Sequence, residues 1–239
     1  MNLEQNRVIA YFQPIFTKKI NKPCAYEVLG RYISEQGSIK SLGPFFEAPN
    51  VQHEEALKLD RIVRKDAFKK YAEEKRKELL FVNIRMAWLP SAEGASEDLI
   101  TLQLAREYGI PPGNMVIEIT EEEYNGGEKQ LQAIMNFKKA GCKIALDDYG
   151  KSASNLERLA IVKPDIIKIN MDYIHNSEKS LYYREYLRSL AAFADAVGIE
   201  VLYEGVENKT QYEFCNTLKV SYYQGFYFAK PQSSMGLAS

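Results

Sequence analysis

The chain is poor in the residue types that mark several common classes of protein. It has 3 cysteines and 2 histidines among 239 residues. Cys24, Cys142 and Cys215 are far apart and odd in number, which favours small core residues in a reducing cytosol over a disulfide framework or a zinc site. His53 and His175 belong to no acidic motif. This argues against histidine-based metal sites and against Ser-His-Asp chemistry.

Strong charge and long apolar runs are also missing. The formal net charge is -1, so there is no basic field for tracking a DNA or RNA duplex. No apolar stretch approaches the ~20 residues that cross a bilayer, so we expect no membrane insertion. The first residues, MNLEQNRVIAYFQP, are too polar for a signal peptide. We therefore expect a cytoplasmic protein.

What the chain does have is a set of short apolar, partly β-branched runs that end in polar residues. Such runs are typical of strands buried on both faces. Their polar ends are Glu27, Asn83, Glu118, Asp147 with Asp148, and Glu204, and one further run brackets Lys168. Parallel strands bring their carboxyl ends together, so we expect these side chains to share one site.

Pooling five carboxylates with one lysine is electrostatically costly, because like charges at close range raise one another's pKa values or require a counter-charge. Carboxylate and amide oxygens are the ligands that Mg²⁺, Mn²⁺ and Ca²⁺ prefer. The set therefore predicts a divalent-cation site. The alternative is that these acids cap helices or simply face water.

Strand-like and helix-like stretches alternate along the chain. Helical periodicity covers 53–77, 97–108, 129–140, 155–162 and 180–197, and apolar strand-like runs lie between these ranges. The start differs, because two apolar runs flank the polar connector KKINKP and so predict a hairpin. We expect a (βα)₈ TIM-barrel-like fold with one antiparallel strand near the N-terminus, a fold that needs ~250 residues as a single domain.

Seven motifs, in this order, resemble those of the EAL-domain family of cyclic di-GMP phosphodiesterases. They are YEVLGR (26–31), VNI (82–84), EITE (118–121), LDDYG (146–150), DIIKIN (165–170), EGVE (204–207) and QGF (224–226). SLGPFF (41–46) and GKSASNL (150–156) also resemble a YkuI-like subgroup from Bacillus. The resemblance implies that 1–239 is a single EAL-type barrel domain. It also implies a homodimer that hydrolyses cyclic di-GMP to linear pGpG with Mg²⁺ or Mn²⁺, bound as two ions.

The resemblance implies a role for each site residue. The expected first-metal ligands are Glu27, Asn83, Glu118 and Asp147, with Asp148 at the second metal. The expected catalytic residues are Lys168, which would orient or deprotonate the attacking water, Glu204, and Glu121, which would brace the loop after Asp148. The expected substrate contacts are Gln13, Arg31, Gln224 and Glu207. Two alternatives stay open: Arg31 could pair with a surface acid, and Gln13 and Gln224 could be ordinary strand-end amides.

The chain departs from the family pattern at two places. After Asp148, Lys151, Ser152 and Ala153 replace the usual Thr, Gly and Tyr, and serine supplies the backbone freedom of glycine poorly. Asn170 stands where aspartate is usual. These changes put the rate of hydrolysis in question more than the fold or the binding. A non-hydrolysing cyclic di-GMP receptor or protein-interaction module is therefore one alternative function. An unrelated barrel enzyme acting on another phosphate ester is another.

Overall fold

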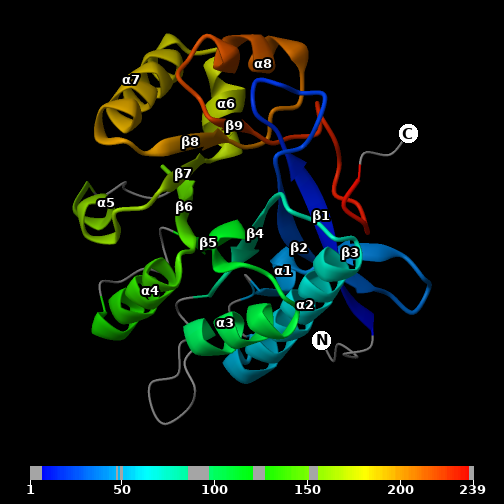
Figure 1. The fold of residues 1–239 in the computed structure, drawn as a ribbon. Coiled ribbons are helices and arrows are strands. Elements are labelled where there is room, and N and C mark those ends of the chain that lie inside the picture. Colours follow the sequence, from blue (N-terminus) through cyan, green and yellow to red (C-terminus); the bar gives the residue numbers. More distant parts are fainter. Residues whose placement is uncertain are drawn as a thin grey trace.

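The fold is a curled, mainly parallel β-sheet with helices outside it (Figure 1). The computed structural model describes residues 7–46, 48, 51–85, 97–120, 127–150 and 156–236. The strands follow the order β1-β2-β4-β5-β6-β7-β8-β9, and β3 pairs with β2 outside this path. The expected TIM-barrel-like α/β fold is therefore confirmed.

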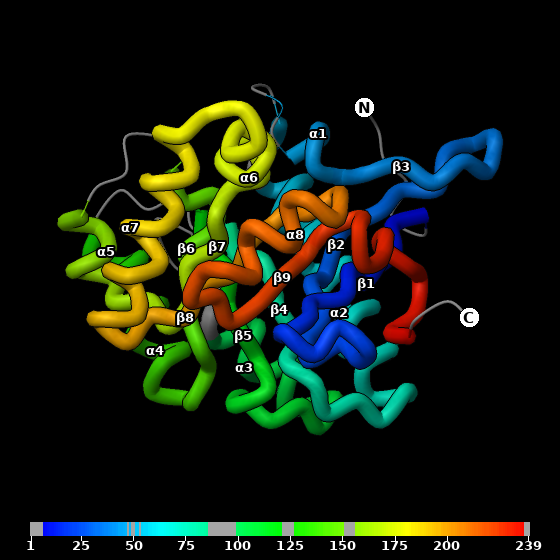
Figure 2. The backbone as a smooth tube through the Cα atoms, turned by 90° about the horizontal axis from the view of Figure 1, so that it is seen from above, coloured from blue at the N-terminus to red at the C-terminus, as the bar shows by residue number. Residues whose placement is uncertain are grey.

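The first strand runs against its neighbours, as the hairpin pattern predicted. β1 (Val8–Ile15) pairs antiparallel with β2 (Ala25–Ile33). Just beyond β1, Phe16 forms an antiparallel bridge to Tyr223 of β9 (Tyr222–Tyr223), with N–H···O distances of 2.9 and 2.8 Å. The N-terminal and C-terminal strands therefore lie side by side, as Figure 2 shows, and the sheet closes on itself.

The remaining barrel strands are short, parallel and almost wholly buried. They are β4 (Leu79–Asn83), β5 (Met115–Thr120), β6 (Lys143–Tyr149), β7 (Ile166–Ile169) and β8 (Glu200–Tyr203). Each of them pairs in parallel with its neighbours in the barrel. All five coincide with the apolar runs of the sequence.

The helices that periodicity predicted lie close to their predicted ranges. They are α2 (His53–Glu73), α3 (Glu97–Glu107), α4 (Glu128–Ala140), α5 (Leu156–Val162) and α7 (Leu181–Val197). Gly141 and Gly198 end α4 and α7 with φ of +99° and +77°, a backbone region that glycine enters without strain. No helix among the described residues is both long and apolar enough to cross a bilayer.

Several short elements escaped the sequence patterns. They are β3 (Ile39–Ser41), α1 (Gly43–Phe46), the 3₁₀ helix η3 (Pro112–Asn114), α6 (Met171–Ser177) and α8 (Lys209–Asn216). Each spans at most about two turns, so periodicity has too few residues to reveal it. Two of them, α6 and α8, border the candidate site described below.

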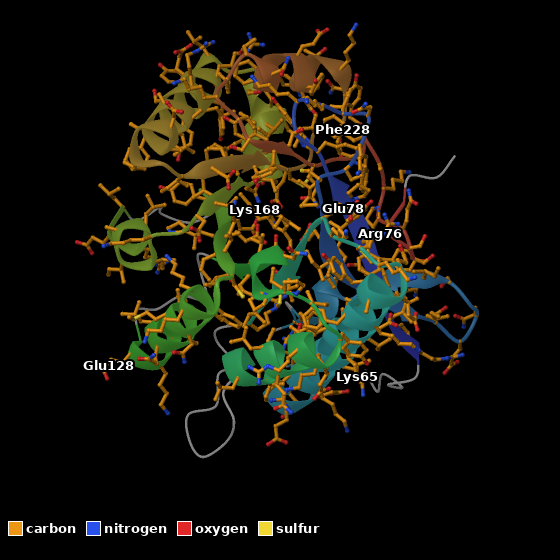
Figure 3. All side chains as sticks on the ribbon, viewed as in Figure 1. Lys65, Arg76, Glu78, Glu128, Lys168 and Phe228 are labelled. Carbon is orange, nitrogen blue, oxygen red and sulfur yellow. The ribbon has the colours of Figure 1, made fainter. Side chains whose placement is uncertain are left out.

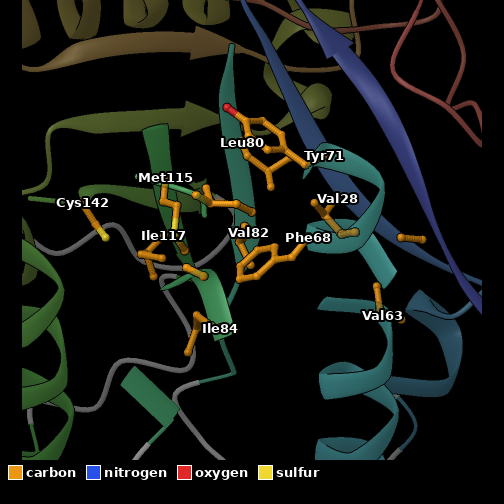
Figure 4. Packing of buried hydrophobic residues seen from close by; sticks show 14 of the residues in the cluster. Val28, Val63, Phe68, Tyr71, Leu80, Val82, Ile84, Met115, Ile117 and Cys142 are labelled. Carbon is orange, nitrogen blue, oxygen red and sulfur yellow. The ribbon is translucent and has the colours of Figure 1, made fainter. Parts of the chain in front are cut away.

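The hydrophobic core has an inner and an outer part. Inside the barrel, each strand contributes one buried side chain to a single plug. The plug is formed by Ile15, Ala25, Phe81, Val116, Ala145, Ile166, Leu202 and Tyr222. Outside the barrel, helices pack on the opposite faces of the strands; in Figure 4, Phe68 and Tyr71 of α2 lie against Val28, Leu80 and Val82. The plug forms the floor on which the polar site is built.

Candidate active site

The polar residues of the expected site that lie inside the barrel follow one rule. Each polar residue lies two residues from the plug residue of the same chain segment, in the direction of the carboxyl ends of the parallel strands. The pairs are Ile15 with Gln13, Ala25 with Glu27, Phe81 with Asn83, Val116 with Glu118, Ala145 with Asp147, Ile166 with Lys168, Leu202 with Glu204, and Tyr222 with Gln224. Side chains two residues apart face the same side of a strand. The alternation that builds an apolar plug therefore builds a polar layer directly above it.

Glu27 differs from the other acids in its position along the strand. Its apolar run ends there in the sequence, but β2 continues to Ile33. The extension persists because β2 also pairs with β1 and β3, while its pairing with β4 ends at Glu27 opposite Phe81. Glu27 therefore lies at the rim of the parallel barrel although it is not at a strand end.

Asp147 and Asp148 are adjacent, and in a regular strand they would face opposite sides. The register of β6 against β7 shifts between Leu146 and Tyr149. Asp148 has a φ of +55°, and its N–H donates to Asp147 Oδ1 at 2.8 Å. This irregularity lets both carboxylates line the same cavity at the mouth of the barrel. Aspartate tolerates the left-handed conformation better than most residues.

Lys168 lies at the centre of the site and is fully buried (Figure 3). Its Nζ is 2.5 Å from Glu118 Oε1 and 2.8 Å from Glu204 Oε1. It is also 3.1 Å from Asp147 Oδ1 and 3.5 Å from Glu27 Oε1. Three strands, and the residue that follows β8, thus direct carboxylates at one ammonium group, which is the polar setting that a buried lysine requires.

The crowding changes the protonation of these groups. Burial raises the pKa of Glu118 well above its ordinary value and also raises the pKa of Asp147. Burial raises the pKa of Glu204 to about 8, although Lys168 opposes the shift. Burial alone would lower the pKa of Lys168, but Asp147, Glu118 and Glu204 raise it well above its ordinary value. Lys168 therefore keeps its positive charge. This single charge does not balance the four carboxylates around it.

The oxygen atoms of the site fit a divalent cation. Glu27, Glu118 and Asp147 each offer an oxygen, and these three atoms lie within 4.8 Å of one another. Asn83 Nδ2 donates to Glu118 Oε2 at 2.8 Å and Gln224 Nε2 donates to Glu27 Oε2 at 2.6 Å, which orients both carboxylates. Gln224 Oε1 is buried without a hydrogen-bond partner in the described structure. Carboxylates with an oriented second layer are the usual surroundings of a hard cation.

Two cavities flank this cluster and share Glu27 and Asp148. One, of about 280 Å³, is lined by Arg31, Asn83 and Asp147 and extends to Phe46, Asp60 and Arg85. The other, of about 260 Å³, is lined by Gln13, Glu204, Glu207, Gln224 and Phe226. The described structure therefore brings the expected ligands and substrate contacts to one divided cleft.

Two cavity residues lie at its edges. Arg31 Nη1 donates to Gly30 O at 2.9 Å, and its guanidinium lies 5.7 Å from the centre of the Tyr11 ring. Glu207 is exposed, and His175 Nε2 lies 3.7 Å from its Oε2. Arg31 thus lies at the edge of the cavity, and its role as a phosphate contact stays a prediction.

Asn170 has a structural role that the sequence did not reveal. Its Oδ1 accepts the Asp172 N–H at 2.9 Å and so caps α6. Its amide therefore faces Asp148 and donates to Oδ1 at 2.6 Å. An aspartate here could still cap the helix but could not donate this bond. The N-cap pattern before a seven-residue helix was the available signal.

Some predictions fall outside the part of the chain that the structure describes. Glu121 and residues 151–155, which include Lys151, Ser152 and Ala153, belong to this group. Sequence reasoning also missed cavity residues that are described, namely Thr120, Asp60, Arg85 and Phe46. Thr120 lies within the EITE motif, so its place beside the expected ligands was the one available signal. Phe46 ends the SLGPFF motif and Arg85 directly follows the VNI motif, whereas nothing in the sequence pointed to Asp60.

Comparisons with known proteins agree with this arrangement. The EAL domain family model matches residues 1–231. The chain is 33% identical over 231 residues to YkuI of Bacillus subtilis, an EAL-domain containing protein, covering 95% of this chain and 56% of that protein. It is 27% identical over 239 residues to the cyclic di-GMP phosphodiesterase PdeR of Escherichia coli, covering 98% of this chain and 35% of PdeR. The chain therefore spans about half or less of these relatives.

Solved structures give the same result. The crystal structure of B. subtilis YkuI in complex with cyclic di-GMP and calcium matches with a TM-score of 0.86 and 31% identity, over 98% of this chain and 58% of that one. BlrP1 of Klebsiella pneumoniae, with manganese and cyclic di-GMP, matches with a TM-score of 0.82 and 23% identity, over 99% of this chain and 59% of that one. The second match shows the fold alone. With the family model covering almost the whole chain, and YkuI as a relative in both sequence and structure, the protein belongs to the EAL domain family.

Proposed function

We propose that this chain is a cyclic di-GMP phosphodiesterase that requires divalent cations. Water would add across one phosphate ester bond of the ring to give linear pGpG. The observation that carries the proposal is the set of three convergent carboxylate oxygens within 4.8 Å, at the junction of two cavities. A cyclic dinucleotide has a nucleoside on each side of the phosphate that is cut, so a cleft divided at the cation site suits it. Relatives named as cyclic di-GMP phosphodiesterases support this choice.

The cations are expected to be Mg²⁺ or Mn²⁺, as two ions. Glu27, Asn83, Glu118 and Asp147 would hold the first and Asp148 would reach the second. When bound, the ions would neutralise charge on the phosphate and on the attacking and leaving oxygens. The structure of B. subtilis YkuI with calcium supports divalent cations in general.

The side chains around the cations would bind and orient the substrate and move its protons. Lys168 would orient or deprotonate the attacking water, since its Nζ lies among the carboxylates that would hold the cation. Glu204, whose Oε1 lies 2.8 Å from that ammonium, would act as a further catalytic carboxyl group beside the cations. Arg31 would hold a phosphate through its two-pronged guanidinium. Gln13, Gln224 and Glu207 would contact the rest of the ligand, and Glu121 would brace the loop after Asp148.

We also infer that residues 1–239 form one barrel domain that acts in the cytoplasm as a homodimer. The dimer is supported by apolar side chains on α5 and α7, of which Leu156 is 62%, Leu181 71% and Tyr182 90% exposed. Exposed apolar side chains are found at interfaces between subunits. Sedimentation of Tyr182→Glu against the wild type tests it, and an unchanged molecular mass would rule out this face as the interface.

Turnover is proposed to be slow, and a non-hydrolysing cyclic di-GMP receptor or protein-interaction module is the second candidate. One specific contact favours the receptor. The Asn170 amide donates to Asp148 Oδ1 and so would compete with a second cation for this oxygen. The altered residues at 151–153 point the same way. Neither change touches the three convergent carboxylates.

A paired measurement tests the proposal. Binding of cyclic di-GMP is titrated in Ca²⁺, and pGpG formation is followed in Mg²⁺ and in Mn²⁺. The proposal expects both binding and turnover, with turnover lost in Glu27→Ala because a ligand is removed. Binding without turnover selects the receptor. Absence of both, or full turnover in Glu27→Ala, contradicts the site assignment.

A further inference from the structure

The segment 204–208 connects β8 to α8 and carries three residues of the second cavity, Glu204, Gly205 and Glu207. Glu204 at its start contacts Lys168, and Glu207 near its end lines the cavity from an exposed position. The segment has no regular secondary structure of its own. Its neighbours must therefore fix where Glu207 lies.

The first half of the segment is fixed by close backbone packing. Gly205 has a φ of +62°, and a Cβ placed on it would collide with Met171 Cβ. Val206 N–H donates to Gln224 O at 3.0 Å, and Tyr227 N–H donates back to Val206 O at 3.0 Å. These contacts hold the chain as far as Val206 and leave Glu207 to be positioned separately.

Glu207 is held through its backbone by a buried amide that does not line the cavity. Its N–H donates to Gln211 Oε1 at 2.7 Å, and Gln211 is 3% exposed. Gln211 Nε2 in turn donates to Glu178 Oε2 at 3.2 Å, at the end of α6. The other oxygen of Glu178 accepts Asn208 Nδ2 at 3.2 Å, and Asn208 Oδ1 accepts the Gln211 N–H at 2.9 Å.

The chemistry of the donors and acceptors fixes the direction of each hydrogen bond from Glu207 through Gln211 to Glu178. A backbone N–H can only donate, so the oxygen of Gln211 must face Glu207. Its NH₂ group then faces Glu178, which as a carboxylate can only accept. The amide orientation is therefore set by its partners. A carboxylate at position 211 would keep the first bond and lose the second.

We propose that Gln211 and Glu178 are positioning residues that hold Glu207 in the cavity and thereby set the affinity for the dinucleotide. Neither residue lines either of the two cavities, so they act through Glu207. The inference rests on the proposed function, since it takes cyclic di-GMP as the ligand. These hydrogen bonds connect the end of α6, through α8, to the cavity that Glu207 lines. They do not involve the expected cation ligands on the barrel strands.

The test exchanges the hydrogen-bond donor and acceptor between Gln211 and Glu178. Gln211→Glu places two carboxylates against each other and removes the donor to Glu178. Combining it with Glu178→Gln restores all the bonds, because the amide introduced at position 178 can donate to the carboxylate introduced at position 211 and can still accept from Asn208. Gln103→Glu is the matched control, since Gln103 donates to Glu107 at 3.3 Å on the exposed surface of α3. Each variant is measured for cyclic di-GMP binding in Ca²⁺, for Ca²⁺ binding alone, and for thermal unfolding.

Gln211→Glu is expected to weaken cyclic di-GMP binding about tenfold, a change of about 1.4 kcal/mol, and to raise KM with little change in kcat. Ca²⁺ affinity should stay at the wild-type value, and the double variant should recover dinucleotide binding. Because Glu178 is exposed, Glu178→Gln alone should fold, and it should weaken binding in the same direction.

Two results would overturn the inference. The first is unchanged dinucleotide binding in Gln211→Glu, whatever happens to the melting temperature. The second is an equal loss of binding in the double variant. If the wild type itself fails to bind cyclic di-GMP in Ca²⁺, the proposed function falls and the inference falls with it. Binding by the wild type with no effect of the exchange overturns the inference alone.

Discussion

Replacing Glu27 by glutamine should separate the cation site from the fold. Glu27 is one of the three convergent carboxylates, and its contact with Lys168, at 3.5 Å, is the longest of that lysine's four. Glutamine keeps the shape, and its carbonyl can still accept the Gln224 amide that now lies 2.6 Å from Glu27 Oε2. It also removes one charge from a crowded cluster. The cation-free variant should therefore be at least as stable as the wild type, while cation binding should suffer.

The size of the effect follows from linkage. At a cation concentration of ~100 times Kd, binding stabilises the folded state by ~2.7 kcal/mol. Removing a residue that hydrogen-bonds to a metal ligand already lowers the metal affinity about 10- to 100-fold. Losing a ligand itself should therefore lower it about 100-fold. The stabilisation then falls to about 0.4 kcal/mol. For a chain of this size, the rise in melting temperature that the cation causes would drop from roughly 5–10 °C to about 1–2 °C.

The assay is thermal unfolding with and without Mg²⁺, beside a calorimetric Ca²⁺ titration. Glu200→Gln is the control, because Glu200 bonds Lys143 at 2.6 Å and Tyr222 at 2.9 Å and lies at the opposite end of the barrel. It should keep the full cation increment. If Glu27→Gln keeps that increment, or if Glu200→Gln loses it, the cation is not held where the carboxylates converge.

Three further predictions concern the ligand, the pH dependence and the loop. Arg31→Lys should weaken cyclic di-GMP binding by roughly 1.5–3 kcal/mol, the worth of a charged hydrogen bond that lysine cannot make in pairs; an unchanged Kd by calorimetry would rule out the phosphate role. Burial raises the pKa of Glu204 from 4.5 to about 8, so the folded state holds this proton more tightly than the unfolded state. The cation-free protein should therefore lose stability as the pH rises from 4.5 to about 8. The free energy of unfolding in urea, measured at the two ends of this pH range, should fall less when Mg²⁺ is present. Combining Lys151→Thr, Ser152→Gly and Ala153→Tyr should raise turnover about tenfold, about 1.4 kcal/mol of barrier, with an unchanged Kd. No gain would turn attention to Asn170.

The barrel and its polar layer could be predicted because both depend on local alternation. Val116 and Glu118 face the same interior for the same reason that Ile117 faces the helices. The hairpin at the start was also local, since a polar connector separates two apolar runs. Such patterns need no knowledge of distant contacts.

The parts that could not be predicted depend on contacts between segments far apart in sequence. β9 has only two residues, and its place beside Phe16 closes the barrel. The bond from Asn170 to Asp148 requires α6 to begin where it does. Gln211 and Glu178 meet across 33 residues. None of these pairs has a periodic signature.

A crystal of the protein grown with Mn²⁺ and cyclic di-GMP tests the central claim most directly, because the anomalous signal of manganese locates the ion independently of the dinucleotide. The account predicts an ion at ligand distance from Glu27, Glu118 and Asp147. It also predicts a phosphate of the dinucleotide beside that ion and within reach of Arg31. Manganese bound elsewhere, or a dinucleotide bound with no ion at these three carboxylates, would contradict it.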